Sequence, residues 1–115
     1  MGKTQHLKQL YSFEYNQPTP WCVETTQAFD DWLHGLKDRA VRVRLIRRLV
    51  RAANGNLGDV RSVGEGVFEM REHVGAGWRM YFVNRGDRLI VMLGGGDKRT
   101  QSRDVARAIR WSQEL

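Results

Sequence analysis

One stretch of the sequence brings cationic side chains and candidate proton carriers onto a single surface. Residues 67–83, VFEMREHVGAGWRMYFV, alternate apolar and polar side chains, which predicts a hairpin whose side chains point to opposite faces. The face expected to be core carries Phe68, Met70, Trp78, Met80 and Phe82. The opposite, polar face carries Glu69, Arg71, His73, Arg79 and Tyr81. Neighbours across paired strands lie roughly 5 to 8 Å apart, so we expect the polar residues to form a cluster.

Such a cluster has the groups that cleavage of RNA requires. RNA supplies its own nucleophile, the 2′-hydroxyl, so a protein must remove its proton, neutralise charge on the phosphate and protonate the leaving oxygen. Arginine cannot act as a base near neutral pH. The candidate proton carriers are therefore Glu69, His73, Tyr81 and Lys98. The alternative interpretation is a solvated sheet face on which acids and arginines pair across the strands.

Three other segments add positive charge. Arg61 precedes the hairpin on another predicted strand, and GGGDKRTQ, residues 94–101, projects Lys98, Arg99 and Gln101 from the end of the sheet. Glycines before a helix can bind phosphate, but Asp97 before Lys98 does not fit a phosphate-binding P-loop, and a turn with solvated charges is the alternative. The predicted second helix carries six arginines, on a solvated face or on a docking surface for phosphates or an acidic partner: Arg39, Arg42, Arg44, Arg47, Arg48 and Arg51.

Other kinds of catalytic site find no support in the sequence. His6, His34 and His73 are scattered, and no carboxylate pair accompanies them at metal-ligand spacing, so we predict no metal and no cofactor. The serines lack the motif context of a serine, histidine and acid triad.

Composition limits the class of protein and its partners. The chain of 115 residues has a net charge of +6, and 15 of its 19 basic residues are arginine, which favours a phosphate-bearing or acidic partner, although solubility alone can produce such an excess. Cys22 is the single cysteine, so no intrachain disulfide is possible. With no apolar run typical of a signal peptide or membrane span, we expect a cytoplasmic protein without membrane contact.

Periodicity predicts the elements that position these residues. Residues 1–20 read as a flexible N-terminal arm, and residues 21–115 as a single domain that begins with a short strand in WCVETT. A first helix, capped by Thr25 or Thr26, places four apolar residues on one stripe: Phe29, Trp32, Leu33 and Leu36. A second helix is expected to bury Ala40, Val43, Ile46, Leu49, Val50 and Ala53.

After Asn56 the apolar period changes from 3.6 to 2 and predicts four antiparallel strands. The strand at Leu89–Leu93 is apolar on both faces and should be the most buried. A last helix turns Val105, Ala108 and Ile109 inward. The predicted fold is α+β, with two N-terminal antiparallel helices packed on a twisted antiparallel sheet of about four to five strands and a short C-terminal helix.

The sequence resembles the RelE/ParE superfamily of type II toxin–antitoxin toxins, specifically its HigB-like addiction module killer branch. The resemblance runs from Trp21 to Trp111 through FDDWLHGLKD, RLVRAANGNLGDVRSVGEGVFEMR, GAGWRMYF and LGGGDKRTQSRDVARA. It implies the α+β fold above, a cognate antitoxin, usually a helix-turn-helix DNA-binding protein, and metal-independent cleavage of mRNA on the ribosome. DNA would be contacted only through the antitoxin.

The resemblance also implies roles for individual residues. Arg79 corresponds to a phosphate-stabilising arginine, Arg71 to a basic strand position, and Lys98 or Arg99 to a basic residue after the last strand. The chain departs from the best-studied nucleases at Glu69, where they carry a lysine, and at Val105, where they carry a tyrosine. Proton transfer is therefore assigned to Glu69 or His73, and Arg61, Tyr81, Arg99 and Gln101 are expected to contact RNA.

Three hypotheses follow. The leading one is an mRNA endoribonuclease toxin in which Arg71, Arg79 and Lys98 hold the scissile phosphate. The second is a toxin on the same scaffold that poisons DNA gyrase and is not itself an enzyme. The third is a non-toxic module whose charges attach it to RNA or to an acidic protein.

Overall fold

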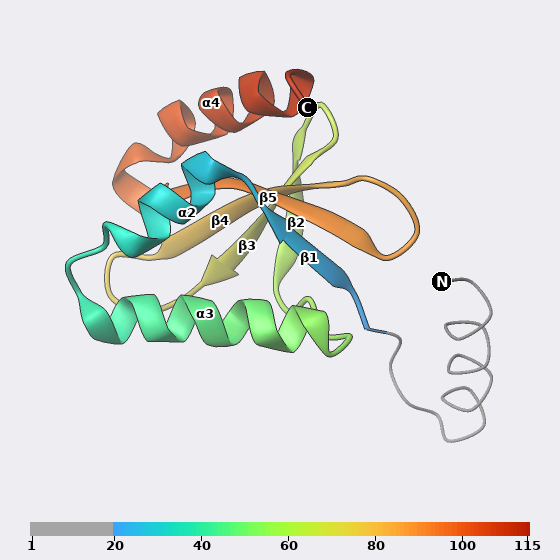
Figure 1. Cartoon of the computed structure of the whole chain (residues 1–115). Helices are drawn as coiled ribbons and strands as arrows, with labels where there is room; N and C mark the ends of the chain where they lie inside the picture. The colour runs from blue at the N-terminus through green and yellow to red at the C-terminus, as the bar shows by residue number, and fades with distance from the viewer. Residues whose placement is uncertain (1–19) are drawn as a thin grey trace.

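The computed structural model describes residues 20–115 as five strands and three α-helices joined by short connections (Figure 1). The predicted N-terminal arm, residues 1–20, lies outside the described residues except for residue 20. The elements in chain order are β1 (Cys22–Thr25), α2 (Gln27–His34), α3 (Arg39–Ala53), β2 (Val60–Gly64), β3 (Val67–Glu72), β4 (Trp78–Asn84), β5 (Leu89–Asp97), the 3₁₀ turn η1 (Lys98–Thr100) and α4 (Gln101–Gln113).

The five strands form one mixed sheet in the order β1-β5-β4-β3-β2. The four later strands are antiparallel, as predicted, with β3 and β4 forming the expected hairpin. The prediction of a wholly antiparallel sheet is wrong at β1, which pairs parallel to β5 from Cys22 with Leu89 to Thr25 with Met92. Such long-range pairing depends on the path of the intervening chain, and the residues of β1 carry no sign of it.

The first apolar face of the sheet packs with α2 and α3. Phe29 and Leu33 of α2 share a core cluster with Met70, Met80 and other strand residues, and Trp32 and Leu36 pack against it at the margin. The predicted stripe of the first helix is therefore confirmed. Thr26 caps this helix by accepting a hydrogen bond from the amide of Phe29 at 3.1 Å. The antiparallel arrangement of α2 and α3 stays a prediction.

Helix α3 faces the core with a different stripe from the predicted one. Its buried residues are Val41, Leu45, Arg48 and Ala52. Four of the residues expected inside are exposed instead: Ala40, Val43, Ile46 and Val50. The sequence of α3 has apolar residues on two sides, and periodicity cannot tell which side faces the sheet.

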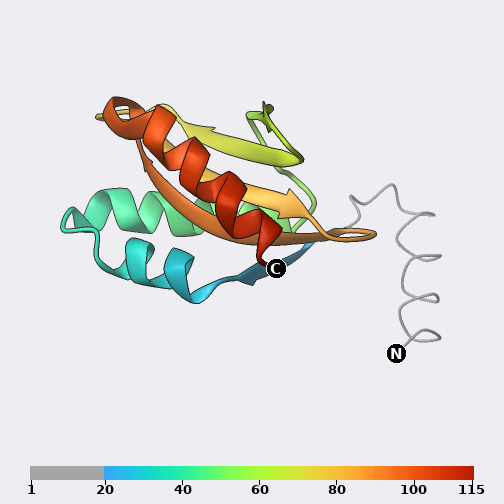
Figure 2. The ribbon, with the colours of Figure 1, turned by 90° about the horizontal axis from the view of Figure 1, so that it is seen from above.

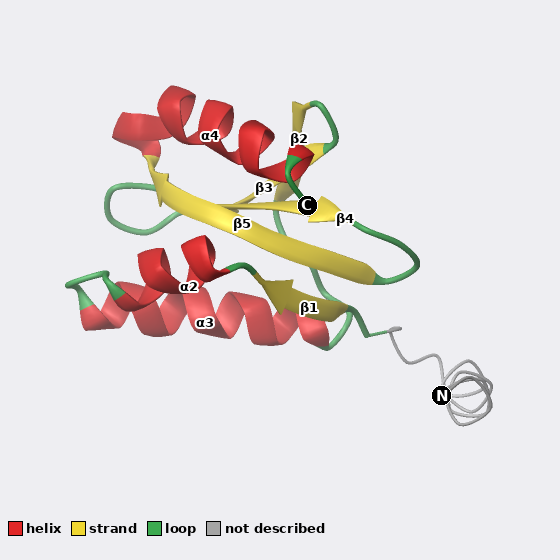
Figure 3. Cartoon of the chain, turned by 45° about the horizontal axis from the view of Figure 1, so that its top comes forward, coloured by secondary structure: helices red, strands yellow, loops and turns green. Residues whose placement is uncertain are grey.

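Helix α4 covers the opposite face of the sheet. Figure 3 shows α4 on one side of the sheet and α2 and α3 on the other, and Figure 2 shows α4 lying across the strands. A second core cluster forms beneath it from Val67, Tyr81, Val83, Leu93 and Ala108, and Val105 and Ile109 pack against this cluster. The inward positions predicted for the last helix are thus confirmed. The hairpin face that the sequence presents as polar is largely a second interior.

Three consecutive glycines let both layers approach β5. Residues 94–101 are expected to run from the last strand toward the last helix, and the structure places Gly94, Gly95 and Gly96 all within β5, which continues to Asp97. A side chain at Gly95 would overlap the indole of Trp32, and one at Gly96 would overlap the carboxylate of Asp104. The glycines are therefore explained by close packing on both faces.

Candidate active site

Four of the five residues predicted to be catalytic border one hollow. Arg71, His73, Arg79 and Lys98 line a cavity of about 470 Å³ together with Glu72, Trp78 and the β3–β4 loop, residues 74–77. The hollow lies where the hairpin meets the end of β5. The structure thus brings together side chains from β3, β4 and η1, of which Arg71 and Lys98 are 27 positions apart in the chain.

The hairpin and one backbone contact fix the positions of the cations. Arg71 lies directly opposite Arg79 in the β3–β4 register, so both side chains project from the same face. Gly77 has a φ of +77°, a left-handed conformation that favours glycine, and lies against the side chains of Lys98 and Arg79. The amide of Lys98 donates a hydrogen bond to the carbonyl of Ala76 at 3.3 Å. These contacts hold three cations around the hairpin turn.

Asp59, which the sequence reading did not single out, connects two of the site residues. Its Oδ2 lies 2.7 Å from His73 Nε2, and its Oδ1 accepts a hydrogen bond from Arg71 Nη2 at 3.1 Å. These hydrogen bonds, from His73 first and then Arg71, lower the pKa of Asp59. Asp59 immediately precedes β2, and its place beside Arg71 follows from the β2–β3 register, which pairs Val60 with Met70. The sequence does not reveal this register, and therefore it did not indicate that Asp59 belongs to the site.

Glu69 lies behind the hollow, inside the protein. Its carboxylate is 0% exposed and accepts hydrogen bonds from Arg79 Nε at 3.1 Å and from Gln101 Nε2 at 3.1 Å to each oxygen. Arg61 Nε lies 3.6 Å from it on the outer side. The expectation that Glu69 lies on an open surface is wrong, because α4 brings Gln101 over it. Glu69 instead fixes the orientation of the Arg79 guanidinium.

Tyr81 is also buried beneath α4. It is 1% exposed, and within residues 20–115 its hydroxyl has no hydrogen-bond partner. Burial, and then the nearby charges of Glu69 and Asp104, raise the pKa of Tyr81 well above its usual range. The expected RNA contact by Tyr81 is wrong for this conformation of the protein, since no surface of its ring is open to a ligand.

Arg99 lies in a neighbouring hollow of about 400 Å³, to which Lys98 also contributes. Its guanidinium pairs with Asp97 at 2.9 Å, and its amide donates to the same carboxylate. The hydrogen bond from the Arg99 side chain lowers the pKa of Asp97. Of the two basic residues considered after the last strand, Lys98 borders the hairpin hollow and Arg99 does not.

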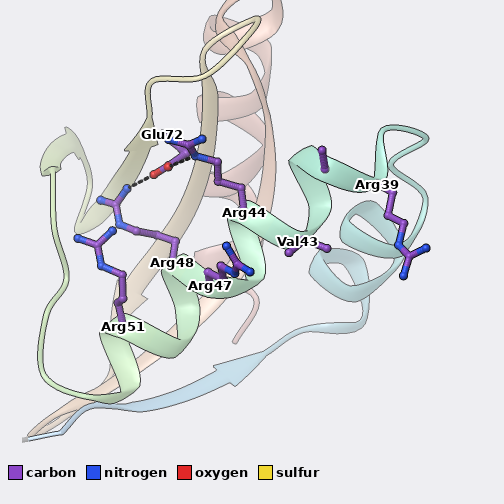
Figure 4. A pocket seen from close by; sticks show the side chains of 8 residues that line it. Arg39, Val43, Arg44, Arg47, Arg48, Arg51 and Glu72 are labelled. Atoms are coloured by element: carbon purple, nitrogen blue, oxygen red, sulfur yellow. Dashed lines mark hydrogen bonds and ion pairs between the residues drawn. The ribbon is translucent and has the colours of Figure 1, made fainter.

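Arg48 of α3 connects the backbone segments that carry the site residues. Its guanidinium is 4% exposed and donates hydrogen bonds to the carbonyls of Leu57, Asp59 and Arg71. It also pairs with Glu72 at 2.9 Å, and Arg44 pairs with the second oxygen of the same carboxylate (Figure 4). The sequence reading placed Arg48 on a solvated face. Its spacing does indicate burial, because Arg48 follows the buried Leu45 by three positions and precedes the buried Ala52 by four.

The described residues hold no group of three or more histidine, cysteine, aspartate and glutamate side chains arranged to bind a metal ion. None of the helices within residues 20–115 is long and apolar enough to span a membrane.

Comparison with solved structures defines the class of fold. A double arginine-to-alanine mutant of the E. coli toxin RelE in the free state matches with a TM-score of 0.62 at 11% identity, over 80% of this chain and 97% of that chain. The toxin–antitoxin complex RelBE2 from Mycobacterium tuberculosis contains a chain that matches with a TM-score of 0.57 at 15% identity, over 70% of this chain and 93% of that chain. The protein therefore has a RelE-like fold, which is the fold that the resemblance implied.

Sequence comparison gives the family. Residues 31–113 match the family described as Phage derived protein Gp49-like (DUF891), and the chain belongs to that family. A protein of Haemophilus influenzae (strain ATCC 51907 / DSM 11121 / KW20 / Rd), described as an uncharacterized protein, is 41% identical over 93 residues. That alignment covers 81% of this chain and 94% of the relative.

Proposed function

We propose that this protein is the toxin of a type II toxin–antitoxin system and cleaves mRNA on the ribosome without a metal ion. The observation that carries the proposal is the hairpin hollow, in which three cations and a histidine surround one space large enough for a phosphodiester. The RelE-like fold and the titles of the matched structures, a toxin and a toxin–antitoxin complex, support the same conclusion.

In the proposed mechanism Arg71, Arg79 and Lys98 bind the non-bridging oxygens of the scissile phosphate. The guanidinium of Arg79 is held by Glu69 and by the carbonyl of Gly77, so it is oriented before RNA binds. Charge that grows on the phosphate during attack is stabilised best by donors that need no rearrangement. In this proposal Arg61 and Gln101, both close to Glu69, position the Glu69 carboxylate, which in turn orients Arg79.

Proton transfer is assigned to His73. Its Nε2 bonds to Asp59, which orients the ring, while the imidazole is largely exposed at the mouth of the hollow, with 71% of its side chain accessible. The 2′-hydroxyl loses its proton to the base, its oxygen bonds to phosphorus, and the bond from phosphorus to the 5′ oxygen breaks. The products are a 2′,3′-cyclic phosphate and a 5′-hydroxyl end. Lys98 has a second role in this proposal, which is to donate a proton to the leaving 5′ oxygen.

A cognate antitoxin is the second part of the proposal. The RelBE2 chain that shares the fold comes from a toxin–antitoxin complex. We propose a helix-turn-helix antitoxin for this chain, which would then contact DNA only through that partner. The protein would work in the cytoplasm, where its mRNA substrate is translated.

The test is to map mRNA 5′ ends after brief induction of the chain in growing cells. New ends inside translated codons are expected. His73→Gln and Lys98→Gln should each reduce cleavage by about 10²- to 10⁴-fold, since each removes a group in contact with the reacting atoms. Both side chains are exposed, so these variants should keep the wild-type fold.

Arg79 needs a more careful substitution. Arg79→Ala would leave the buried Glu69 carboxylate without a charged neighbour in the interior, which destabilises the fold. Arg79→Lys keeps the charge and loses the planar pair of donors. We expect this variant to remain folded and to lose about 10²-fold or more of the cleavage.

Arg85→Gln in the β4–β5 turn is the matched control, because it removes an exposed cation far from the hairpin hollow. It should cleave like the wild type. Growth arrest with unchanged mRNA ends would refute the nuclease proposal. Cleaved complexes on supercoiled plasmid with purified DNA gyrase would then favour a gyrase poison, and normal growth on expression would favour a non-toxic binding module.

A further inference from the structure

Helix α3 has a second apolar stripe that the fold leaves uncovered. The described residues include four exposed large apolar side chains, and three of them lie on α3: Val43, Ile46 and Val50, with 38%, 40% and 53% of their surface accessible. Their offsets of 3 and 4 place them on one face of the helix, away from Val41, Leu45 and Ala52, which pack into the core. A helix that is apolar on both sides is typical of one buried on both sides.

Arginines surround this stripe. Arg39, Arg47 and Arg51 are exposed, and together with Val43, Arg44, Arg48 and Glu72 they line a groove of about 740 Å³ along α3 (Figure 4). We call the stripe and this groove the α3 outer face. Helix α3 contains six arginines and no acidic residue. Like charges three or four positions apart on a helix destabilise it, so carboxylates from a partner would stabilise α3.

The chain itself neutralises only part of this charge. Glu72 pairs with Arg44 and Arg48, whereas within residues 20–115 no salt bridge involves Arg39, Arg47 or Arg51. The unpaired guanidinium groups lie beside the apolar stripe. The surface therefore offers an apolar strip and a row of cations at the same time.

We propose that the α3 outer face binds an acidic amphipathic helix of a partner protein. Apolar side chains of that helix would cover Val43, Ile46 and Val50, and its carboxylates would pair with Arg39, Arg47 and Arg51. Amphipathic helices commonly bind in this way, with their apolar face against an apolar groove of the partner. RNA is the poorer occupant, because its phosphates would satisfy the arginines and leave the valines and the isoleucine exposed to water.

The position of this face links it to the candidate active site. Glu72 borders both the α3 groove and the hairpin hollow, and Arg48 binds Glu72 as well as the carbonyl of Arg71. A helix seated on α3 would thus lie next to the hollow and narrow the approach of RNA to it. Naming the partner as the antitoxin rests on the proposed function, whereas the binding chemistry of the face does not.

The experiment uses the purified full chain and two labelled synthetic peptides of about 20 residues, long enough to form helices. One carries a leucine stripe flanked by glutamates, and the other carries lysine in place of each glutamate. In fluorescence anisotropy titrations the acidic peptide should bind at least about tenfold more tightly than the lysine peptide. Equal binding of the two peptides, or no binding of the acidic one, would overturn the proposal.

Three variants locate the binding site. Val50→Glu and Arg47→Glu should each weaken binding of the acidic peptide by about tenfold or more, since the first places a carboxylate in the apolar stripe and the second reverses the charge of a pairing group. Arg110→Glu, an equal change of charge on an exposed position of α4, is the control and should bind like the wild type. All three side chains are exposed, and circular dichroism melting would verify that the variants fold.

A labelled single-stranded RNA of the same length distinguishes the other class of partner. RNA binding that falls in Arg47→Glu, together with acidic-peptide binding that is unchanged in Val50→Glu, would identify a phosphate-binding surface and overturn the proposal. None of these titrations measures toxicity or cleavage. The proposal for the α3 outer face can therefore be refuted while the nuclease proposal stands, and the nuclease proposal can be refuted while the binding proposal stands.

Discussion

Arg48→Met should destabilise the protein more than any other change of a single charge on α3. The substitution keeps an unbranched side chain of similar length and removes a guanidinium that makes five hydrogen bonds. Three backbone carbonyls, those of Leu57, Asp59 and Arg71, would lose a donor, and Glu72 would lose its buried partner. Each unpaired buried acceptor costs about 1 to 3 kcal/mol, and breaking a buried ion pair costs about 3 to 5 kcal/mol.

These costs overlap, because Glu72 keeps Arg44 and the loop at Leu57 can relax toward water. We therefore expect a loss of about 3 to 5 kcal/mol in the free energy of unfolding. With an urea m-value of about 1.5 kcal/mol/M, the unfolding midpoint would fall by roughly 2 to 3 M. Tryptophan fluorescence is a suitable probe, since Trp32 and Trp78 pack against the core cluster.

Arg51→Met is the matched control for this prediction. It makes the same chemical change one turn away on the same helix, at an exposed position. Its effect should stay within about 0.5 kcal/mol. If Arg48→Met cost no more than Arg51→Met, the conclusion that the Arg48 guanidinium holds the segments around Asp59 and Arg71 together would be refuted.

Three further substitutions probe the two interiors and the ion pair at Glu72. Gly95→Ala would drive a methyl group into the indole of Trp32 and should lower the free energy of unfolding by about 1 to 3 kcal/mol, measured by urea titration; an unchanged midpoint would contradict the close packing. Tyr81→Phe removes a buried hydroxyl without a partner among the described residues, so stability in the same titration should stay equal or rise, and a loss above about 1 kcal/mol would mean that the hydroxyl is paired. For Glu72, burial raises the pKa, but hydrogen bonds from Arg44 and Arg48 outweigh it, and the folded-state pKa lies below 4.5. Its contribution to stability is therefore present above pH 4.5 and is lost as the pH falls through the lowered value, so Glu72→Gln should flatten the decline of thermal stability below pH 4.5; an equally steep decline would exclude this ion pair as a source.

Local patterns in the sequence were enough to predict most of the elements. Alternation in residues 67–83 predicted the hairpin, and the stripe at Phe29 and Leu33 predicted the inward side of α2. A threonine cap, at Thr25 or Thr26, and the inward side of α4 were also predicted, because each depends on side chains within a few positions of one another. Arg71, Arg79 and Lys98 border one hollow because a hairpin register and one strand end suffice to bring them there.

Only the tertiary structure decided what lies on the polar side of the hairpin. Glu69 and Tyr81 look like surface residues in the sequence, since a carboxylate and a phenol are polar and alternate with core residues. Helix α4 begins 20 positions after Tyr81 in the chain. It covers both residues and supplies Gln101 as a partner for Glu69. No local pattern shows that coverage, because it depends on where a distant helix finds apolar surface to bury.

The sequence by itself determined the periodicity of each element, the excess of arginine and the presence of cations around one turn. The tertiary structure decided the direction of β1, the side of α3 that faces the sheet, and the pairing of Asp59 with His73. The physical reason is that periodicity records how side chains are distributed around one element. Which side is buried, and which charges meet, depends on competition for contact among elements far apart in the chain, and that competition is settled only when they pack together.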